Sequence, residues 1–345
     1  MKKYLKANAT NAFQLHHTKG ICQTHRYVPL SIILVAHGNE PIPPTGWGAV
    51  EQVIWQYTLR LRALGHEVTI VNKHRIAAIL TVMWLRLSQR VDVVHCHSEK
   101  PVKALSRMRG VLLVSTTHNP LNPLQLDHSE LKALKRCQYA PYHLILREDI
   151  RALIISRNPG AQCAVLPNGV EVHEFKTVAT GNGKAAYVGR IQERKRQDDC
   201  ARLLDGSGLE CDFIGPNYGE IEPSEALQKS MIGEWDRATL HNRLCQYSCL
   251  ILLSKSEGQP LVVVEALAAG LPVVISPACT GNLDLSQPFI HVVEKDEDLI
   301  PAVQTAISQR EELTTQIRTY AEQNFDYDSL VQRYVAQLEA WREVQ

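Results

Sequence analysis

The sequence predicts an α/β protein made of two consecutive halves in which buried strands alternate with helices. Short apolar runs of strand length recur along the chain, and helix-spaced apolar residues lie between many of them. The alternation begins again after a hydrophilic stretch at residues 171–184. With 345 residues, of which 45% are hydrophobic and 21% charged, the chain is long enough for about two domains with sizeable cores.

The first half opens with a strand at residues 31–36, which a loop rich in proline and glycine follows. Apolar residues at helical spacing then predict a helix from Val50 to Leu64, which Gly65 ends. Further strands are expected at residues 68–71, 91–95, 111–116, 142–146 and 164–166. Residues 1–28 precede this pattern and contain five basic and no acidic residues, so we expect a basic arm outside the sheet.

Gly46 and Gly48 lie directly before the first helix, with Trp47 between them. Glycine allows a ligand to approach the backbone closely, and the N–H groups at a helix N-terminus favour a phosphate or a sugar. These three residues therefore form a candidate ligand-binding loop. Alternatively, the glycines only form a tight turn.

Residues 75–90 form a predicted helix that is apolar nearly all round, with Arg75, Arg86 and Arg90 at its ends. One interpretation is a crossover helix packed on the sheet. Another is a membrane-surface element, because a basic amphipathic helix that carries tryptophan suits the interface between water and lipid.

Histidines gather at the ends of two predicted strands. His95, Cys96 and His97 suggest a metal site, but side chains alternate along a strand, so Cys96 points away from both histidines. A strand-end histidine pair is the better interpretation. His118 follows the strand at 111–116, at the carboxyl edge where open α/β sheets bind ligands.

The most informative stretch is residues 249–276, which reads as strand, polar loop, helix and strand. Pro260 suits the first position of the helix, and Gly270 suits its end. The N–H groups of Leu261 and Val262 would then lack helical partners, and such groups favour a phosphate above the sheet.

Two carboxylates flank this helix start, Glu257 in the loop and Glu265 within the helix. A carboxylate can accept hydrogen bonds from both hydroxyls of a vicinal diol, so the pair could hold a ribose and a second sugar ring. Alternatively, Glu257 is a solvated loop acid and Glu265 is a partner of the helix dipole.

The second half begins with a strand at residues 185–188 and a basic turn that contains Arg190 and Lys195. The two cations could neutralise a diphosphate, or the turn is simply a solvated basic segment. The acidic triplets at 296–298 and 326–328 each precede a closing helix and are interpreted as helix caps rather than metal ligands. Other elements are expected at residues 198–204, 211–214, 229–233, 240–247, 301–323 and 330–341.

Four ordered motifs resemble those of glycosyltransferase family 4, retaining enzymes of the GT-B fold. The stretch E-G-Q-P-L-V-V-V-E-A-L-A-A-G-L-P-V-V resembles the family's E-x7-E signature, and G-R-x-x-x-x-K matches at Arg190 and Lys195. P-N-G-V occurs at residues 167–170. The N-terminal glycine loop of the family is similar to Pro43, Pro44, Gly46, Gly48 and Glu51, although Trp47 replaces one of the usual adjacent glycines.

This resemblance runs from about Ser31 to the C-terminus and implies two Rossmann-like domains whose parallel sheets face a central cleft. We expect an acceptor domain at residues 29–169, joined by a C-terminal helix at 329–345, and a donor domain at 170–328. The implied reaction moves a sugar from a nucleoside diphosphate to a hydroxyl of a glycan, lipid or small molecule. It retains the anomeric configuration and requires no metal or other cofactor.

The resemblance also implies roles for single residues. His118 and Glu257 would contact the transferred sugar and are the expected catalytic residues, Glu265 would bind the ribose, and Arg190 and Lys195 would bind the diphosphate. The other expected donor contacts are Gly46, Trp47, Gly48, Leu261 and Val262. The alternative is a non-catalytic subunit that binds nucleotide sugars, which the altered glycine loop allows and the retained glutamates and cations disfavour.

Charge is distributed unevenly, although the net charge is +1. Residues 1–168 hold 21 Lys and Arg against 9 Asp and Glu, whereas residues 169–345 hold 16 against 27. The basic half could meet an anionic acceptor or an anionic membrane, with Lys2, Lys3 and Lys6 as contributors, or it could simply attract the acidic half. No aromatic-interleaved basic motif is present, so nucleic acid is not an expected partner.

The remaining composition favours a cytoplasmic protein, with the inner membrane face as a candidate place of peripheral contact. The nine cysteines include no C-x-x-C pair, and no apolar run reaches the length of a membrane span. A G-x-G-x-x-G fingerprint is also absent, which argues against a hydride-transfer enzyme.

Overall fold

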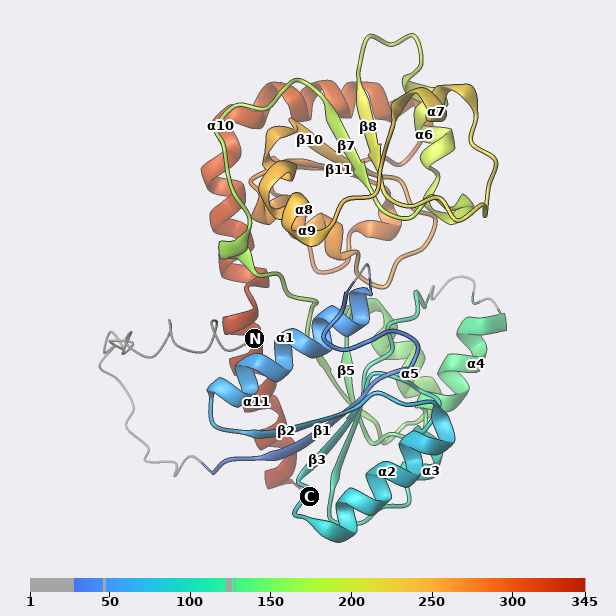
Figure 1. Ribbon diagram of the computed structural model, residues 1–345, viewed down its shortest axis with the longest axis vertical. Coiled ribbons are helices and arrows are strands. Elements are labelled where there is room, and N and C mark those ends of the chain that lie inside the picture. The colour runs from blue at the N-terminus through green and yellow to red at the C-terminus, as the bar shows by residue number, and fades with distance from the viewer. Residues whose placement is uncertain (1–27, 46–47, 122–125, 127, 345) are drawn as a thin grey trace, which may run out of the picture.

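The computed structural model describes residues 28–45, 48–121, 126 and 128–344. These residues form two six-stranded sheets with helices on their faces, stacked one above the other in Figure 1. We call them the first and the second lobe, by the sheet that each contains. Nearly all of the predicted basic arm, and both Gly46 and Trp47 of the glycine loop, lie outside the described residues.

The first sheet has the strand order β2-β1-β3-β4-β5-β6, and all of its neighbouring strands are parallel. Its strands are β1 (Ser31–Val35), β2 (Glu67–Val71), β3 (Val93–Cys96), β4 (Leu112–Ser115), β5 (Tyr142–Ile145) and β6 (Gln162–Val165). The helices between them are α1 (Ala49–Ala63), α2 (Arg75–Ser88), α3 (Val102–Leu105), α4 (His128–Cys137) and α5 (Arg151–Arg157).

Both faces of the first sheet are covered, which explains why its strands read as unbroken apolar runs. Ile32 and Leu34 pack in one cluster with α1, whereas Ile33 and Val35 pack in another with α2 and α3. All four side chains are at most 1% exposed. The alternation of side chains along β1 therefore supplies two cores at once.

The second sheet has the order β12-β11-β10-β7-β8-β9 and is also parallel throughout. Its strands are β7 (Ala185–Val188), β8 (Cys211–Ile214), β9 (Met231–Gly233), β10 (Cys249–Leu252), β11 (Val273–Ile275) and β12 (Ile290–Val292). Its helices are α6 (Gln197–Leu204), α7 (Glu225–Ser230), α8 (Arg237–Arg243), α9 (Leu261–Ala268) and α10 (Leu299–Phe325). The strands and helices predicted from the sequence are present within a few residues.

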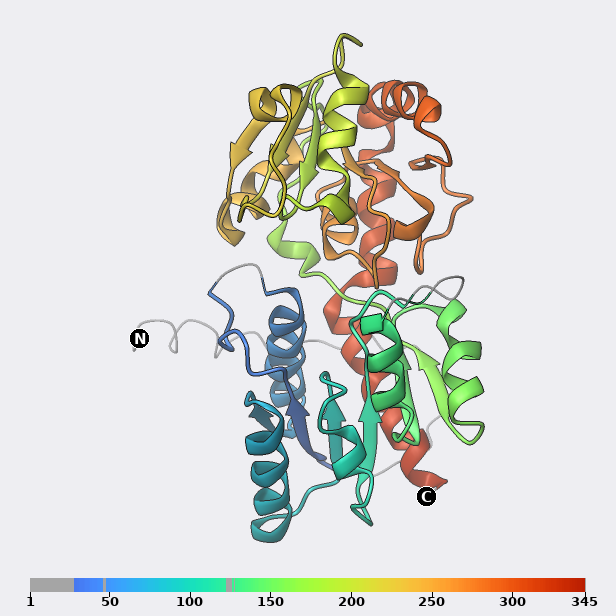
Figure 2. The same ribbon diagram turned by 90° about the vertical axis from the view of Figure 1, so that its right-hand side faces the viewer.

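The last helix, α11 (Tyr327–Glu343), returns to the first lobe. Figure 2 shows α10 passing down from the second lobe and α11 continuing along the first. The ring of Tyr334 packs edge-on against Tyr57 of α1, and Trp341 packs on Tyr142 of β5. Seven side chains of α11 belong to the same apolar cluster as β1 and α1, so this helix completes the core of the first lobe.

The chain crosses between the lobes at two adjacent places. The N–H of Val170 donates to the carbonyl of Phe325 at 2.8 Å, and the N–H of Tyr327 donates to the carbonyl of Val170 at 3.2 Å. Gly169 lies so close to the ring of Tyr327 that a Cβ atom there would be 2.5 Å from it. A glycine is therefore required at this crossing.

The stretch predicted as a hydrophilic linker, residues 171–184, begins differently from that expectation. Val172 and Phe175 are 0% and 3% exposed and pack in the core of the second lobe. The spacing of the apolar residues Val170, Val172 and Phe175 changes from two to three and does not repeat, so it matches neither a strand nor a helix period and did not indicate core residues.

In each sheet, the strands that come first along the chain are added on one side of the starting strand, and the later strands are added on its other side. In the first sheet β1 lies between β2 and β3, and in the second sheet β7 lies between β8 and β10. Open parallel sheets bind ligands beyond the carboxyl ends of the strands, at the point where the side changes. The loops that follow β1, β3, β7 and β10 are therefore the places to look for a site.

Candidate active site

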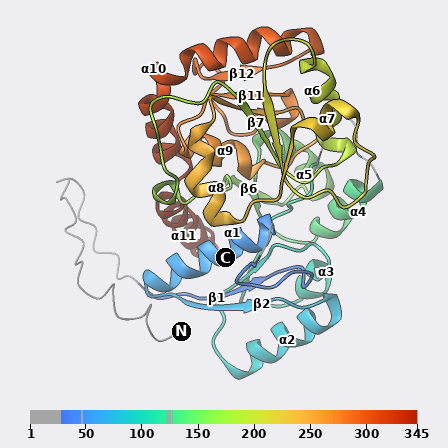
Figure 3. The same cartoon turned by 45° about the horizontal axis from the view of Figure 1, so that its top comes forward.

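A cavity of about 560 Å³ lies between the two lobes and is lined by residues of both. Its walls include the start of α1 and the loop after β4 from the first lobe, and the loops after β7 and β10 with α8 and α9 from the second. Figures 1 and 3 show α8 and α9 opposite α1. This volume suits a small organic ligand.

All predicted site residues that the structure describes line this cavity: Gly48, His118, Arg190, Lys195, Glu257, Leu261, Val262 and Glu265. Gly46 and Trp47 are outside the described residues. The sequence motifs, which lie up to 217 residues apart along the chain, thus meet at one place.

Two helices point their N-terminal ends at the cavity. Gly48 is the N-cap of α1 and Pro260 is the N-cap of α9, and neither residue has a side chain that can accept a hydrogen bond from the first turn. Backbone N–H groups at such ends attract anions and are strengthened by the helix dipole. The first residues of both helices can therefore contribute donors to a phosphate or a sugar.

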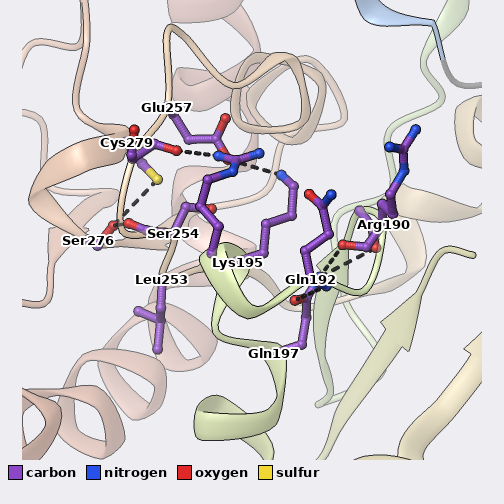
Figure 4. Close-up of polar contacts among 12 residues, drawn as sticks. Arg190, Gln192, Lys195, Gln197, Leu253, Ser254, Glu257, Ser276 and Cys279 are labelled. Atoms are coloured by element: carbon purple, nitrogen blue, oxygen red, sulfur yellow. Dashed lines mark hydrogen bonds and ion pairs between the residues drawn. The ribbon is translucent and has the colours of Figure 1, made fainter. Parts of the chain in front are cut away.

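Glu257 is held by two cations from the loop after β7 (Figure 4). The Nζ of Lys195 lies 3.0 Å, and a guanidinium nitrogen of Arg194 lies 3.1 Å, from the same carboxylate oxygen, Oε1. Burial raises the pKa of Glu257, but Lys195 and Arg194 lower it by more, so the pKa lies below its ordinary value. The carboxylate is therefore ionised at neutral pH, and its negative charge partly neutralises the positive charge of Lys195.

Arg190 lies apart from this cluster. Figure 4 shows its guanidinium pointing away from Glu257 and Lys195, and it lies over the ring of Tyr218 at 5.1 Å from the ring centre. Arg190 is exposed, whereas the side chain of Lys195 is only 14% exposed. The structure thus brings both predicted cations to the cavity and places Arg194, rather than Arg190, beside Lys195.

Glu265 forms a second ion pair, with Arg237 at the start of α8. The two side chains lie 2.5 Å apart, and the side chain of Glu265 is 7% exposed. Arg237 was missed by sequence reasoning because it occurs in a short polar helix 28 residues before Glu265, without a motif. The oxygen of Glu265 that this pair engages is Oε1.

His118 faces the cavity from the first lobe and rests on a chain of buried rings. Its Nε2 lies 3.0 Å from Nδ1 of His97, and the ring of His97 contacts that of His95 at a tilt of 40°, with the ring centres 4.1 Å apart. His95 in turn contacts the hydroxyls of Thr116 and Tyr334. Burial lowers the pKa of His95 to about 3 and that of His97 well below its ordinary value, so both rings are neutral.

The two lobes also touch directly beside the site. Arg147 donates to the carbonyl of Glu257 at 2.8 Å, and the amide of Asn168 donates to the carbonyl of Gln259 at 3.0 Å. A Cβ atom on Gly258 would lie 3.2 Å from the carbonyl oxygen of His118. The glycine of the E-G-Q-P motif therefore permits this close approach of the lobes.

The second acidic triplet acts as a helix cap, as the sequence indicated: Asp326 caps α11 by accepting from the N–H of Asp328 at 3.0 Å. The first triplet differs, because Asp298, the N-cap residue of α10, makes no side-chain bond to that helix and instead accepts from the N–H of Lys295 at 3.2 Å in the 3-10 turn Asp296–Asp298. In the part of the chain that the structure describes, no group of three or more His, Cys, Asp or Glu side chains could hold a metal ion. No helix among these residues is both long and apolar enough to cross a bilayer.

Comparison with known proteins adds two kinds of information. Residues 171–324, most of the second lobe, match the family model described as glycosyl transferases group 1. The chain is 27% identical over 187 residues to the lipopolysaccharide 1,6-galactosyltransferase of Salmonella typhimurium, an alignment that covers 48% of this chain and 50% of that protein. The chain thus spans about half the length of this relative.

Solved structures extend the likeness to both lobes. Sucrose-phosphate synthase from Thermosynechococcus elongatus has a TM-score of 0.76 at 13% identity, over 92% of this chain and 100% of that one. HepE of Anabaena, solved with UDP and glucose, has a TM-score of 0.69 at 16% identity, over 90% and 100%. These likenesses confirm the predicted fold class, an α/β GT-B fold with two parallel sheets.

Proposed function

We propose that this chain, whose residues 171–324 match the glycosyl transferases group 1 model, is a retaining nucleotide-sugar glycosyltransferase that needs no metal. The observation that carries the proposal is the second-lobe wall of the cavity. Lys195, Arg194 and the start of α9 converge there with Glu257, at the carboxyl ends of β7 and β10. Residues 170–328 would bind the donor, and residues 29–169 the acceptor.

In this proposal the donor lies across the second-lobe wall. Lys195, Arg190 and the N–H groups of Leu261 and Val262 bind the diphosphate, while the carboxylate of Glu265 accepts from the ribose hydroxyls. Glu257 contacts the transferred sugar, and His118 contacts it from the opposite wall. The start of α1, with the glycine loop of Gly46, Trp47 and Gly48, completes the donor site.

The reaction breaks the bond between the anomeric carbon and the β-phosphate oxygen and forms a bond from that carbon to the acceptor oxygen. The electron pair of the broken bond stays on the diphosphate oxygen, and the proton of the acceptor hydroxyl is transferred to the departing diphosphate. Negative charge therefore grows on the leaving group, where the fixed cations and N–H groups stabilise it.

The acceptor is proposed as a hydroxyl of a glycan, a lipid or a small molecule. One support is the similarity to a lipopolysaccharide 1,6-galactosyltransferase. Another is the first-lobe wall of the cavity, where the amide of Gln52 and the ring of His118 could form hydrogen bonds with an acceptor. The structure assigns no residue as a covalent nucleophile.

A thermal-shift screen of nucleoside diphosphates and nucleotide sugars tests the proposal. A ligand that binds only the folded protein at 100 times its Kd adds about 2.7 kcal/mol of stability. Any stabilising nucleotide sugar would then be incubated with glycan and lipid acceptors, and the anomeric configuration of the product would be read by NMR. No stabilisation by any member would refute the donor site, whereas tight binding without turnover on any acceptor would favour the non-catalytic subunit.

A further inference from the structure

We propose that the outer face of α2 binds the surface of an anionic lipid bilayer. This face consists of five large apolar side chains, Ile76, Leu80, Met83, Trp84 and Leu87, and we call it the α2 outer face. It lies away from the cavity: all residues of α2 are described, and none of them lines the cavity.

The five side chains form one continuous stripe. Their exposed fractions are 72%, 62%, 51%, 64% and 89% in the order given above. At about 100° per residue they occupy an arc of about 100° on the helix. The buried side chains of the same helix, Ala78, Val82 and Leu85, lie on the opposite side and pack against the sheet.

The structure confirms the interpretation of this segment as a crossover helix, and the membrane-surface interpretation stays a prediction. α2 is a crossover helix packed on the first sheet, and it also presents an apolar stripe to solvent. Single exposed apolar side chains are common, but a contiguous patch of this kind marks a binding surface.

The surroundings of the stripe are basic. No acidic residue occurs between Glu67 and Asp92 or between Glu99 and Asp127, and each of these segments contains four Lys or Arg. The two segments meet in space, because a Cβ atom on Gly110 would lie 3.8 Å from the guanidinium of Arg86. The exposed basic residues of the rim are Lys73, Arg75, Arg86, Arg90, Lys103, Arg107 and Arg109.

The positive charge of the rim favours an anionic bilayer over a second copy of the chain as the binding partner of the α2 outer face. In a symmetric dimer formed through the stripe, the same surface of each copy would meet itself, so the two basic rims would face one another and repel. An anionic bilayer attracts the rim, accepts the apolar stripe at the boundary of its acyl chains and suits the indole of Trp84.

The position of α2 in the molecule is compatible with such docking. Figures 1, 2 and 3 all show α2 at the outside of the first lobe, away from the second sheet. Its N-terminal end is at the carboxyl edge of the sheet, because Lys73 packs closely on Gly38, which follows β1. A bilayer on this face would leave the cavity open.

Co-sedimentation of the full chain with vesicles tests the proposal. The vesicles are phosphatidylcholine alone, or equal parts phosphatidylcholine and phosphatidylglycerol, at ionic strengths of about 0.1 and 1 M, where the screening length is about 10 and 3 Å. We expect binding to the anionic vesicles at the lower salt, little at the higher salt and little to phosphatidylcholine.

Paired variants separate the two contributions. Trp84→Ser with Leu87→Ser should lower the partition coefficient at least about tenfold, because two large apolar side chains no longer insert. Arg75→Gln with Arg86→Gln should lower it about 25-fold, at about fivefold per charge. Matched controls on the second lobe are Ile232→Ser with Leu285→Ser, both exposed apolar residues, and Lys229→Gln with Lys295→Gln.

All altered side chains are exposed, and circular dichroism and thermal melting establish that each variant is folded. The proposal is overturned if the folded wild-type protein stays in the supernatant with anionic vesicles at low salt. It is also overturned if the α2 variants sediment like the wild type. Conversion of a dimer to a monomer by the Trp84→Ser, Leu87→Ser variant in sedimentation velocity would instead assign the face to self-association.

Discussion

Nε2 of His118 lies 3.0 Å from Nδ1 of His97, and the two rings are stacked with their centres 5.3 Å apart. Burial lowers the pKa of both rings, that of His118 to about 3, so both are neutral and one nitrogen atom of the pair donates to the other. His97 thereby fixes the rotation of the His118 ring and decides which edge of it faces the cavity.

His97→Leu should lower the rate of sugar transfer about fivefold and leave the Kd for the nucleoside diphosphate unchanged. The variant removes one orienting hydrogen bond, worth about 1 kcal/mol, without touching the second-lobe wall. Steady-state kinetics and calorimetric titration measure the two quantities. A variant that loses nucleotide affinity in proportion to its rate would show that His97 only supports the fold.

Lys195→Ala should weaken binding of the nucleoside diphosphate by about 1.5–3 kcal/mol, the value of a charge-assisted contact. Arg190→Ala should do the same if the guanidinium leaves Tyr218 for the diphosphate. Titration with and without EDTA measures both effects and the metal requirement. Lys255→Ala is the matched control, since Lys255 pairs with Glu193 outside the cavity lining. Loss of binding in EDTA would contradict a metal-free site.

Glu257→Gln and Glu265→Gln should have opposite effects on nucleotide affinity. Glu257 engages the charge of Lys195, so its neutralisation should strengthen diphosphate binding by about 1 kcal/mol while it lowers transfer. Glu265→Gln should weaken binding, because it removes the proposed ribose contact and leaves Arg237 without its partner. Equal losses of affinity in both variants would refute the separate roles.

The fold should lose stability steeply as the pH falls below 6.5. Burial lowers the pKa of His95 to about 3 and that of His143 to about 4, whereas in the unfolded chain both have the ordinary value of 6.5. Between these values the unfolded state binds more protons, so stability is present above pH 6.5 and is lost as the pH decreases. The loss is about 2 kcal/mol for each histidine between pH 6.5 and 5.

Denaturant unfolding at a series of pH values measures this slope. His143→Gln should flatten it, because the glutamine amide can still donate to the carbonyl of Ala140, as Nε2 of the His143 ring does at 3.0 Å, and cannot take up a proton. His173→Gln, at an exposed position, should leave the slope unchanged. An identical slope in both variants would contradict the assignment to buried rings.

Much of the architecture was predictable because strand and helix periods are local. The buried runs at β1 and β10, and the proline and glycine at the two ends of α9, are each contained within a few neighbouring residues. The edge strand β12 was missed because only three residues, Ile290–Val292, form it, and one of them is a histidine. The helices α4 and α5 were also missed, because α4 has a largely polar sequence and the seven residues of α5 are too few to show a helical period.

The candidate site was predicted as a set of residues rather than as a set of contacts. The motifs located Glu257, Lys195 and Glu265, yet nothing local indicates that Glu257 binds Lys195 across 62 residues or that Arg237 approaches Glu265 across 28. Ion pairs of this kind depend on how β7, β10 and α8 are placed by the sheet order. The partner of His118 was equally hidden, because His97 had been interpreted only as one of a strand-end pair.

Because α11 returns to the first lobe, the core of this lobe cannot be completed until the end of the chain has been synthesised. Tyr334, Leu338 and Trp341 fill the core beside β1 and α1, but a ribosome adds them long after β6 has emerged. At about 5–20 residues per second, the delay is on the order of ten to thirty seconds. During that interval the nascent first lobe exposes the apolar surface that α11 later covers, and exposed surface of this kind favours aggregation.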